Sequence, residues 1–182
     1  TPSATTHDAV DLPQLLADLA SAHHILAHHG VLDGFGHVSV RDPRDPSRFL
    51  IAQSMAPELV QPEDILTLDF DCRPVDGDAR KRYLETWIHA EIYRLRPDVN
   101  SVVHSHSPSV IPFAASSVRL RPIYHMAGFL SNGSPVFDMR HCFGCTDMLV
   151  RNSVQGRALA ETLGDSDVAL MRGHGFVTTG PS

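Results

Sequence analysis

Two histidines, His104 and His106, close a short apolar run that begins at Asn100. If the run is a β-strand, residues two apart point to the same face, so both imidazoles leave the strand end side by side. That arrangement suits two ligands of one metal ion. Two histidines do not complete a metal site, so further ligands must come from elsewhere in the chain.

A third candidate ligand, His174, stands between Gly173 and Gly175, directly after the apolar segment 168–171. The two glycines permit a turn with unusual backbone angles and a close approach to a ligand. Three imidazoles that leave one position open are typical of a catalytic divalent-metal site, whereas structural sites are closed. The alternative interpretation is that all three are ordinary turn or core histidines.

Glu85 is the candidate acid/base. The spacing of apolar residues predicts a helix over 83–96, which Pro97 ends. Because that helix runs antiparallel to the strand that follows it, its first turn lies near His104 and His106. A carboxylate there can occupy the open metal position or move a proton. An acid that merely stabilises the helix dipole is the alternative.

The rest of the chain alternates irregularly between helical and strand patterns. A helix is predicted over 12–29, and its four histidines (His23, His24, His28 and His29) are expected mostly at the surface or at the helix end. One clear hairpin and several single strands predict α/β layers around a mixed, largely antiparallel sheet. The predicted strands are 34–41, 48–52, 65–70, 100–104, 135–138, 167–171 and 176–179, with further helices ending at 115 and spanning 147–163.

Bulk composition narrows the class of protein. The 182 residues suit one domain, and 42% apolar with 20% charged residues is ordinary for a soluble protein. A net charge of −6 without a basic block argues against nucleic acid as a partner, and no apolar run reaches the roughly 18 residues that would cross a membrane. Three cysteines form no disulfide framework, which favours the cytoplasm. We expect a flexible tail over 1–11 and a single catalytic domain over 12–182.

Ordered segments over about residues 12–180 resemble the class II aldolase/adducin family. They are Gly36-His-Val-Ser39, Leu59-Val-Gln-Pro-Glu-Asp-Ile65, Glu85-Thr-Trp-Ile-His89, Arg96-Pro-Asp-Val-Asn100, Val-Val-His104-Ser-His106 and Arg172-Gly-His174-Gly175. The resemblance implies a three-layer α/β/α fold and a homotetramer with active sites at the subunit interfaces. In that family further helices follow the final strand, and we expect them to be missing here.

The resemblance also implies one divalent metal ion on His104, His106 and His174, with Glu85 as acid/base or transient fourth ligand. Imidazole suits zinc, manganese and iron alike, so the sequence leaves the metal open.

The substrate pocket departs from the sugar-phosphate aldolases. Those members usually carry Gly-Asn-Val-Ser where this chain has His37, a Thr/Ser-Gly pair where it has Ser54-Met55, and Ser-Ser where it has Tyr83-Leu84. A phosphate cradle needs small residues and free backbone N–H groups. The bulkier residues therefore argue against a phosphate and favour a flatter, aromatic acid.

Several residues are candidates for contacts with such an acid. Four residues are predicted to bind the substrate: His37, Ser54, Arg82 and Tyr124. His125 is predicted to donate a proton, because it stands nineteen residues after His106, where aldolase members place a tyrosine acid. One residue of the run Arg80-Lys81-Arg82 can pair with a carboxylate. The alternatives are a solvated basic run and a locally bonded His37.

The resemblance is closer to the decarboxylases of the family. The predicted function is a metal-dependent lyase that decarboxylates a hydroxylated acid through an enolate, which the metal stabilises and an acid protonates. Retro-aldol cleavage of a non-phosphorylated hydroxy-keto acid, a non-heme Fe(II) oxygenase and a non-catalytic adducin-like domain are the alternatives. The Cys142-Phe-Gly-Cys145 motif has no second pair to support a metal or redox role.

Overall fold

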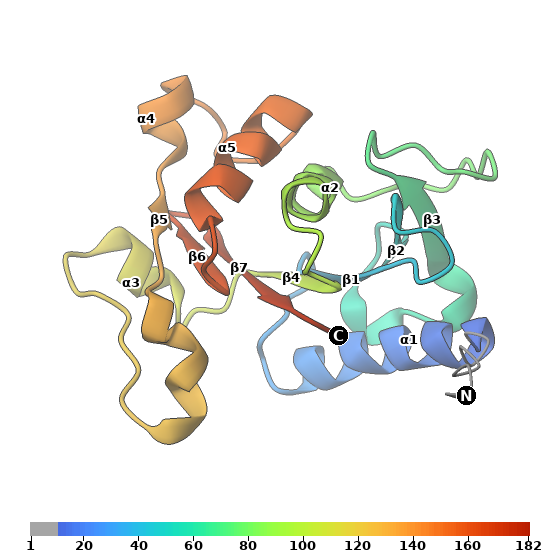
Figure 1. The fold of residues 1–182 in the computed structure, drawn as a ribbon, viewed down its shortest axis with the longest axis horizontal. Helices are drawn as coiled ribbons and strands as arrows, with labels where there is room; N and C mark the ends of the chain where they lie inside the picture. The colour runs from blue at the N-terminus through green and yellow to red at the C-terminus, as the bar shows by residue number, and fades with distance from the viewer. Residues whose placement is uncertain (1–10) are drawn as a thin grey trace, which may run out of the picture.

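The computed structural model describes residues 11–182, so the predicted tail falls almost entirely outside the described residues. The sheet contains seven strands in the order β3-β2-β1-β4-β7-β6-β5, and it runs through the middle of the molecule (Figure 1). Every neighbouring pair is antiparallel except β5 and β6. The predicted mixed, largely antiparallel sheet is confirmed. Its strands are β1 (His37–Arg41), β2 (Arg48–Ala52), β3 (Ile65–Asp69), β4 (Ser101–Ser105), β5 (Val136–Phe137), β6 (Val168–Met171) and β7 (Gly175–Gly180).

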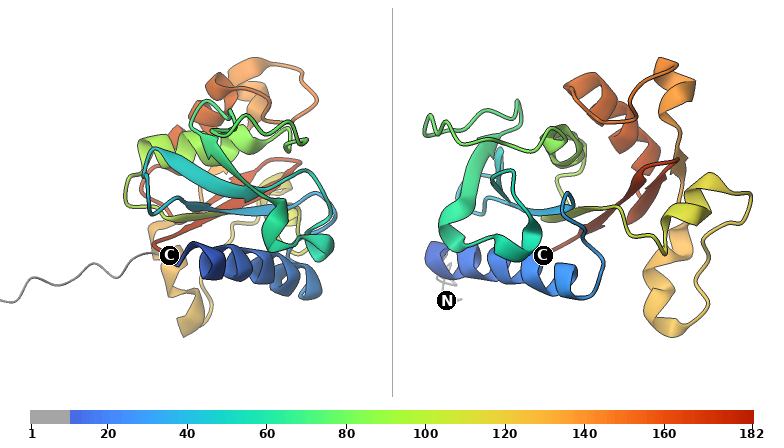
Figure 2. Two further views of the ribbon diagram at one scale, coloured as in Figure 1. Left: turned by 90° about the vertical axis from the view of Figure 1, so that its right-hand side faces the viewer. Right: turned by 180° about the vertical axis from the view of Figure 1, so that it is seen from behind.

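Helices cover both faces of the sheet, which gives the three layers that the resemblance implied. Helix α1 lies on one face, and α2 and α5 lie side by side on the other (Figures 1 and 2). Strand β2 is buried along residues 49–52 without alternation, as expected of a strand covered on both sides. The helices are α1 (Leu12–His28), α2 (Thr86–Leu95), α3 (Ile111–Ala115), α4 (Met139–Phe143) and α5 (Ser153–Leu163), with 3-10 turns η1 (Pro57–Leu59), η2 (Pro62–Asp64) and η3 (His125–Asn132).

Helix α1 carries one histidine into the core. The Asp11 carboxylate accepts from the Gln14 N–H at the helix start, and Gly30, with φ of 66°, follows its end. His23 is fully buried: its Nδ1 bonds the Leu19 carbonyl, and its Nε2 accepts from the Val38 N–H of β1. The expectation that the histidines of this helix lie mostly at the surface is therefore wrong for His23, which ties the helix to the sheet.

Residues 147–152 were predicted as the first turns of a helix, and this is wrong. The side chains of Thr146 and Asp147 accept hydrogen bonds from the N–H groups of Met148 and Leu149, which turns the backbone locally. Met148 takes a φ of 69°, and α5 begins only after Asn152. This non-helical segment runs past the candidate site.

Helix α2 begins at Thr86, three residues later than predicted. Before it, the Tyr83 hydroxyl donates to the Met55 carbonyl and holds the approaching chain in a non-helical path. Glu85 thus occupies the N-cap position, although its side chain caps nothing in α2 and turns away from it. In residues 11–182, no helix is both long and apolar enough to cross a membrane.

Candidate metal centre

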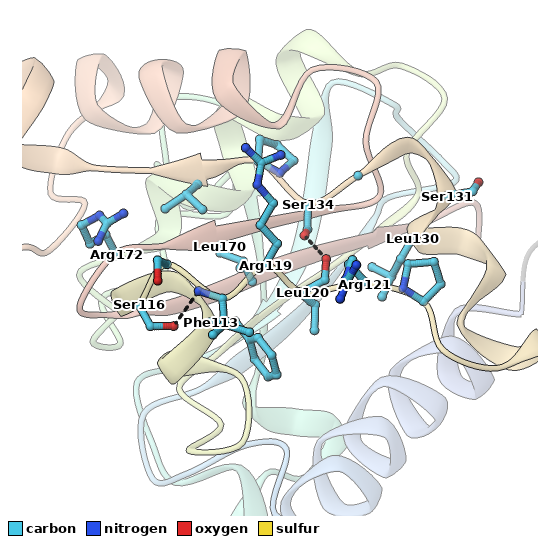
Figure 3. Close-up of a pocket in the computed structure, with 16 residues that line it drawn as sticks. Phe113, Ser116, Arg119, Leu120, Arg121, Leu130, Ser131, Ser134, Leu170 and Arg172 are labelled. Atoms are coloured by element: carbon cyan, nitrogen blue, oxygen red, sulfur yellow. Dashed lines mark hydrogen bonds between the residues drawn. The ribbon is translucent and has the colours of Figure 1, made fainter.

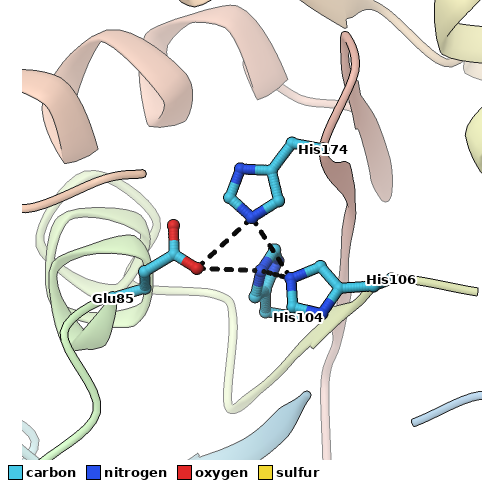
Figure 4. Close-up of side chains that lie close together, drawn as sticks. All are labelled: Glu85, His104, His106 and His174. Atoms are coloured by element: carbon cyan, nitrogen blue, oxygen red, sulfur yellow. Dashed lines mark hydrogen bonds and ion pairs between the residues drawn. The ribbon is translucent and has the colours of Figure 1, made fainter. Parts of the chain in front are cut away.

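Four side chains meet where β4, β7 and the start of α2 converge. They are Glu85, His104, His106 and His174, and one ligand atom from each lies within 4.8 Å of the others (Figure 4). His104 comes from β4, His106 follows that strand, and His174 sits in the turn from β6 to β7. The structure therefore brings together all four residues that the sequence proposed for the metal and its acid/base.

The cluster is formed by the Nε2 atoms of the imidazoles. His106 Nε2 lies 2.9 Å from His104 Nε2 and 3.2 Å from His174 Nε2. Glu85 Oε2 lies 3.4 Å from His104 Nε2 and 3.3 Å from His174 Nε2. One carboxylate oxygen and three ring nitrogens thus face a common point.

The opposite nitrogen of each ring meets an acceptor. His104 Nδ1 is 3.1 Å from the Phe176 carbonyl, and His174 Nδ1 is 2.9 Å from the Met148 carbonyl. His106 Nδ1 lies 3.1 and 3.2 Å from the carboxylate oxygens of Asp33. A carbonyl or carboxylate oxygen can only accept a hydrogen bond, so each Nδ1 must carry the proton that it donates. A neutral ring then has a lone pair on Nε2, which points to the centre of the cluster.

Three lone pairs and a carboxylate oxygen aimed at one point repel one another unless a cation lies between them. Three imidazoles with a carboxylate in reach are a donor set that zinc and other divalent transition metals accept. The residues present therefore fit the divalent metal that the sequence predicted, and they leave its identity open.

The charge state of Glu85 follows from its neighbours. Burial by itself raises the pKa of Glu85, but its contacts with His104 and His174 outweigh burial and hold that pKa well below its usual value. Desolvation lowers the pKa of His104, although Glu85 works against it. Glu85 Oε1 also accepts from the Val150 N–H at 2.9 Å, so the carboxylate is fixed on both oxygens.

Two glycines shape the turn that carries His174. Gly173 has a φ of 68°, a left-handed conformation that side chains other than glycine disfavour. A Cβ on Gly175 would collide with the Ser105 carbonyl of the neighbouring strand. Gly173 therefore permits the turn, and Gly175 lets β7 approach β4 closely enough for His174 to meet His104 and His106.

A cleft of about 620 Å³ opens beside the cluster. Three of the predicted substrate-binding residues, His37, Ser54 and Arg82, line it. The remaining lining combines apolar side chains with three of the four cluster residues, and it consists of Phe35, Lys81, Tyr83, Leu84, Glu85, His106, Asp147, Met148, Leu149, Gly173 and His174.

The three basic residues before α2 differ in what they contact. The Arg80 guanidinium donates to the Asp78 carboxylate and to the Glu63 carbonyl, and the Arg82 guanidinium donates to the Cys72 carbonyl. Lys81 lines the cleft and makes no ion pair within residues 11–182. Lys81 is therefore the cation of this run best placed for an acidic ligand.

Tyr124 and His125 are not brought to the cluster within one chain. Tyr124 is 63% exposed and lines a different cavity with Ile123 and Phe129. An adjoining cavity of about 640 Å³, shown in Figure 3, contains Arg119, Arg121 and Arg172, but none of the four cluster residues. The roles of Tyr124 and His125 stay predictions.

Sequence reasoning missed the groups that support the cluster. Asp33 could have been found, because an acid before Gly34-Phe-Gly36 is typical of a turn in which its side chain accepts from backbone N–H groups, as Asp33 does from Phe35 and Gly36. The Met148 carbonyl and the Val150 N–H leave no sequence signal, since any residue supplies them.

The fold and the cluster together describe an α/β domain with a candidate metal site of three histidines and one glutamate. Residues 17–182 match the model of the Class II Aldolase and Adducin N-terminal domain. The chain belongs to the class II aldolase/adducin family, as the resemblance indicated.

Two curated relatives are decarboxylases by name. The chain is 41% identical over 172 residues to Decarboxylase tropJ of Talaromyces stipitatus, covering 87% of this chain and 65% of that protein. It is 31% identical over 179 residues to 3,4-dihydroxyphthalate decarboxylase of Arthrobacter keyseri, covering 90% of this chain and 68% of that protein. The chain thus spans about two thirds of the length of these relatives.

Among solved structures, the chain superposes on an aldolase II superfamily protein from Pseudomonas syringae with a TM-score of 0.79 and 23% identity. The match covers 97% of this chain and 69% of that one, and it supports the class II aldolase fold.

Proposed function

We propose that this protein is a metal-dependent lyase that removes CO₂ from a hydroxylated aromatic carboxylic acid. The observation that carries the proposal is the convergence of three Nε2 atoms and the Glu85 carboxylate beside a cleft with apolar walls and Lys81. Two relatives with decarboxylase names support it. Tyr83 and Leu84 give the cleft bulk where a phosphate would need small residues.

The three histidines and Glu85 have different roles in the proposed reaction. A divalent ion on His104, His106 and His174 would polarise a substrate oxygen and stabilise the negative charge that builds up as the carbon–carbon bond breaks. Glu85, which is ionised, takes the proton of the substrate hydroxyl through Oε2 and returns it to the carbon that CO₂ leaves. The product hydroxyl then regains its proton from water, so that one proton is consumed for each CO₂ released.

The other cleft residues bind and orient the acid. Lys81 attracts its carboxylate, while Phe35, Leu84 and Leu149 cover the aromatic ring and exclude water from the reacting carbon. Tyr124 and His125 can act as proposed only from a neighbouring chain. We therefore propose a homotetramer with interfacial sites, which light scattering on the purified protein tests.

The proposal is tested by assaying a panel of hydroxylated aromatic and aliphatic acids with Mn, Zn or Fe(II), while CO₂ release and O₂ uptake are recorded. CO₂ release without O₂ uptake is expected. O₂ uptake would favour the oxygenase, aldehyde release the aldolase, and no bound metal with no turnover under any ion would overturn an enzymatic role.

His104→Ala should abolish metal binding. Glu85→Gln should keep the metal while turnover falls by about 10² to 10⁴.

A further inference from the structure

Four buried side chains form a hydrogen-bonded chain from the cleft into the core. His37 Nδ1 lies 2.7 Å from His89 Nε2, His89 Nδ1 lies 2.6 Å from Ser39 Oγ, and Ser39 Oγ lies 2.7 Å from the Tyr93 hydroxyl. None of the four is more than 1% exposed. Groups this well paired in a dry interior constrain one another strongly. These four residues are called the His37 chain below.

The His37 chain is built by two neighbouring elements. His37 and Ser39 are two apart on β1 and so share one face, while His89 and Tyr93 are four apart on α2 and share one side of the helix. Phe49 stacks on the ring of His89 with the planes 8° apart. The sheet and the helix therefore fix all four side chains without the help of any mobile loop.

The Tyr93 hydroxyl determines which atom donates in each hydrogen bond of the His37 chain. Burial raises the pKa of Tyr93, so the phenol keeps its proton and needs an acceptor for it. Within residues 11–182, Ser39 Oγ is the side-chain partner of the Tyr93 hydroxyl, so the buried phenol proton goes to Ser39.

The remaining protons follow in order. Ser39 accepts a hydrogen bond from Tyr93 and donates its own hydroxyl proton to His89 Nδ1. Burial lowers the pKa of His89 to about 3, so this ring is neutral and its one proton sits on Nε2. His89 Nε2–H then donates to His37 Nδ1. A neutral His37 consequently carries its proton on Nε2.

His37 Nε2 faces the cleft. His37 lines the cleft, and its Nε2 has no hydrogen-bond partner within residues 11–182. In that part of the chain, every fully buried side-chain nitrogen or oxygen has a hydrogen-bond partner. Because His37 Nε2 has none, it is not fully buried and reaches the cleft surface. His37 also pairs with His104 across β1 and β4, and the two ring centroids are 5.2 Å apart.

We propose that His89, Ser39 and Tyr93 are positioning residues that lock His37 as a hydrogen-bond donor to the cleft, where its Nε2–H binds the substrate oxygen that gains negative charge. The second half of this proposal rests on the proposed function. A donor fixed before the reaction stabilises developing charge without reorganising, which is how an oxyanion hole accelerates a reaction. His37 then acts as a neutral donor throughout.

The tautomer is tested by ¹⁵N-histidine NMR of the whole protein, with and without zinc. Wild type should show His37 protonated on Nε2 and bare on Nδ1. Ser39→Ala and Tyr93→Phe should populate the opposite tautomer. Tyr83→Phe is the matched control, because Tyr83 touches the His37 ring at 4.4 Å between centroids but donates to Met55 outside the His37 chain, so it should leave the tautomer unchanged.

Protonated Nδ1 on wild-type His37, or an unchanged tautomer in both Ser39→Ala and Tyr93→Phe, would overturn the locking. Backbone amide spectra confirm that each variant is folded. These readouts need no substrate, so they stand even if no acid of the panel is turned over and the proposed function fails.

The role in turnover is tested on whichever acid the wild type decarboxylates. Ser39→Ala should lower kcat by about tenfold while KM changes little, because the donor is needed most in the transition state. Its zinc affinity should match that of wild type. An unchanged kcat in a variant whose tautomer has shifted would overturn the positioning role.

Discussion

The three candidate ligand histidines differ in how firmly their rings are held. His104 and His174 bond backbone carbonyls, of Phe176 and Met148, which the folded chain fixes. His106 instead bonds the side chain of Asp33, which is 45% exposed. The orientation of His106 thus rests on one partly solvated carboxylate. Partners of this kind orient a ligand ring and raise its basicity, so Asp33 is where metal affinity can be changed without touching a ligand.

We expect Asp33→Asn to weaken metal binding by about tenfold, near the lower end of the range for such partners because solvent screens this carboxylate. The amide oxygen can still accept from the Phe35 and Gly36 N–H groups, so the loop should persist and the loss should report on the charge. Competition with a chromophoric chelator measures the affinity.

Asp45→Asn is the matched control for this substitution. Asp45 makes the same kind of turn, accepting from the Ser47 N–H, but it contacts no residue of the cluster. Equal zinc affinity in Asp33→Asn and wild type would show that Asp33 contributes nothing to the site.

At the scale of elements, the sequence predicted the parts whose signals are local. The strand pattern that ends at His104 and the glycines around His174 were sufficient to find three histidines that the fold brings together. The path of residues 147–152 was not predictable, because its apolar spacing suits a helix while side-chain hydrogen bonds from Thr146 and Asp147 favour a turn. Tertiary contacts decide between them: in its turned form the segment supplies the Met148 carbonyl and the Val150 N–H to the site.

The pairing of β4 with β7 depends on Gly175. We expect Gly175→Ala to lower the free energy of unfolding by about 3 kcal/mol or more, since a methyl group would meet the rigid Ser105 carbonyl and either strain or separate the strands. Because separation would move His174 away from His104, zinc affinity should fall with stability. Urea denaturation and zinc titration measure the two effects.

Gly128→Ala provides the comparison, because a Cβ there would meet no atom within 4 Å and no positive φ is involved. It should leave both quantities close to those of wild type. If Gly175→Ala were equally stable, the close approach of the two strands would not be what requires glycine.

At the scale of the whole molecule, several of the twelve histidines serve the core. His23, His37, His89 and His104 are each no more than 1% exposed. The sequence indicated a metal site but not this use, because a histidine inside an apolar pattern does not show whether both ring nitrogens will find partners. His23 and His89 both do, and desolvation lowers the pKa of each.

These buried rings make folding depend on pH in a definite direction. The pKa of His89 is about 3 in the folded protein, whereas an unfolded chain has the ordinary value of 6.5. Below pH 6.5 the unfolded state therefore binds a proton that the folded state does not, and stability falls as pH falls. Linkage gives a loss of about 2 kcal/mol between pH 7 and pH 5 from His89 alone. His23 acts in the same direction.

We therefore expect the metal-free protein, kept so with a chelator, to lose at least about 2 kcal/mol of unfolding free energy between pH 7 and pH 5. In His89→Gln the stability is lower at both pH values, but the difference between them should shrink by about the same amount, because a neutral amide takes up no proton. Urea denaturation at each pH measures both. The exposed His28, changed to Gln, is the control and should leave the difference unchanged. An equal loss in wild type and His89→Gln would mean that His89 does not remain neutral in the folded core.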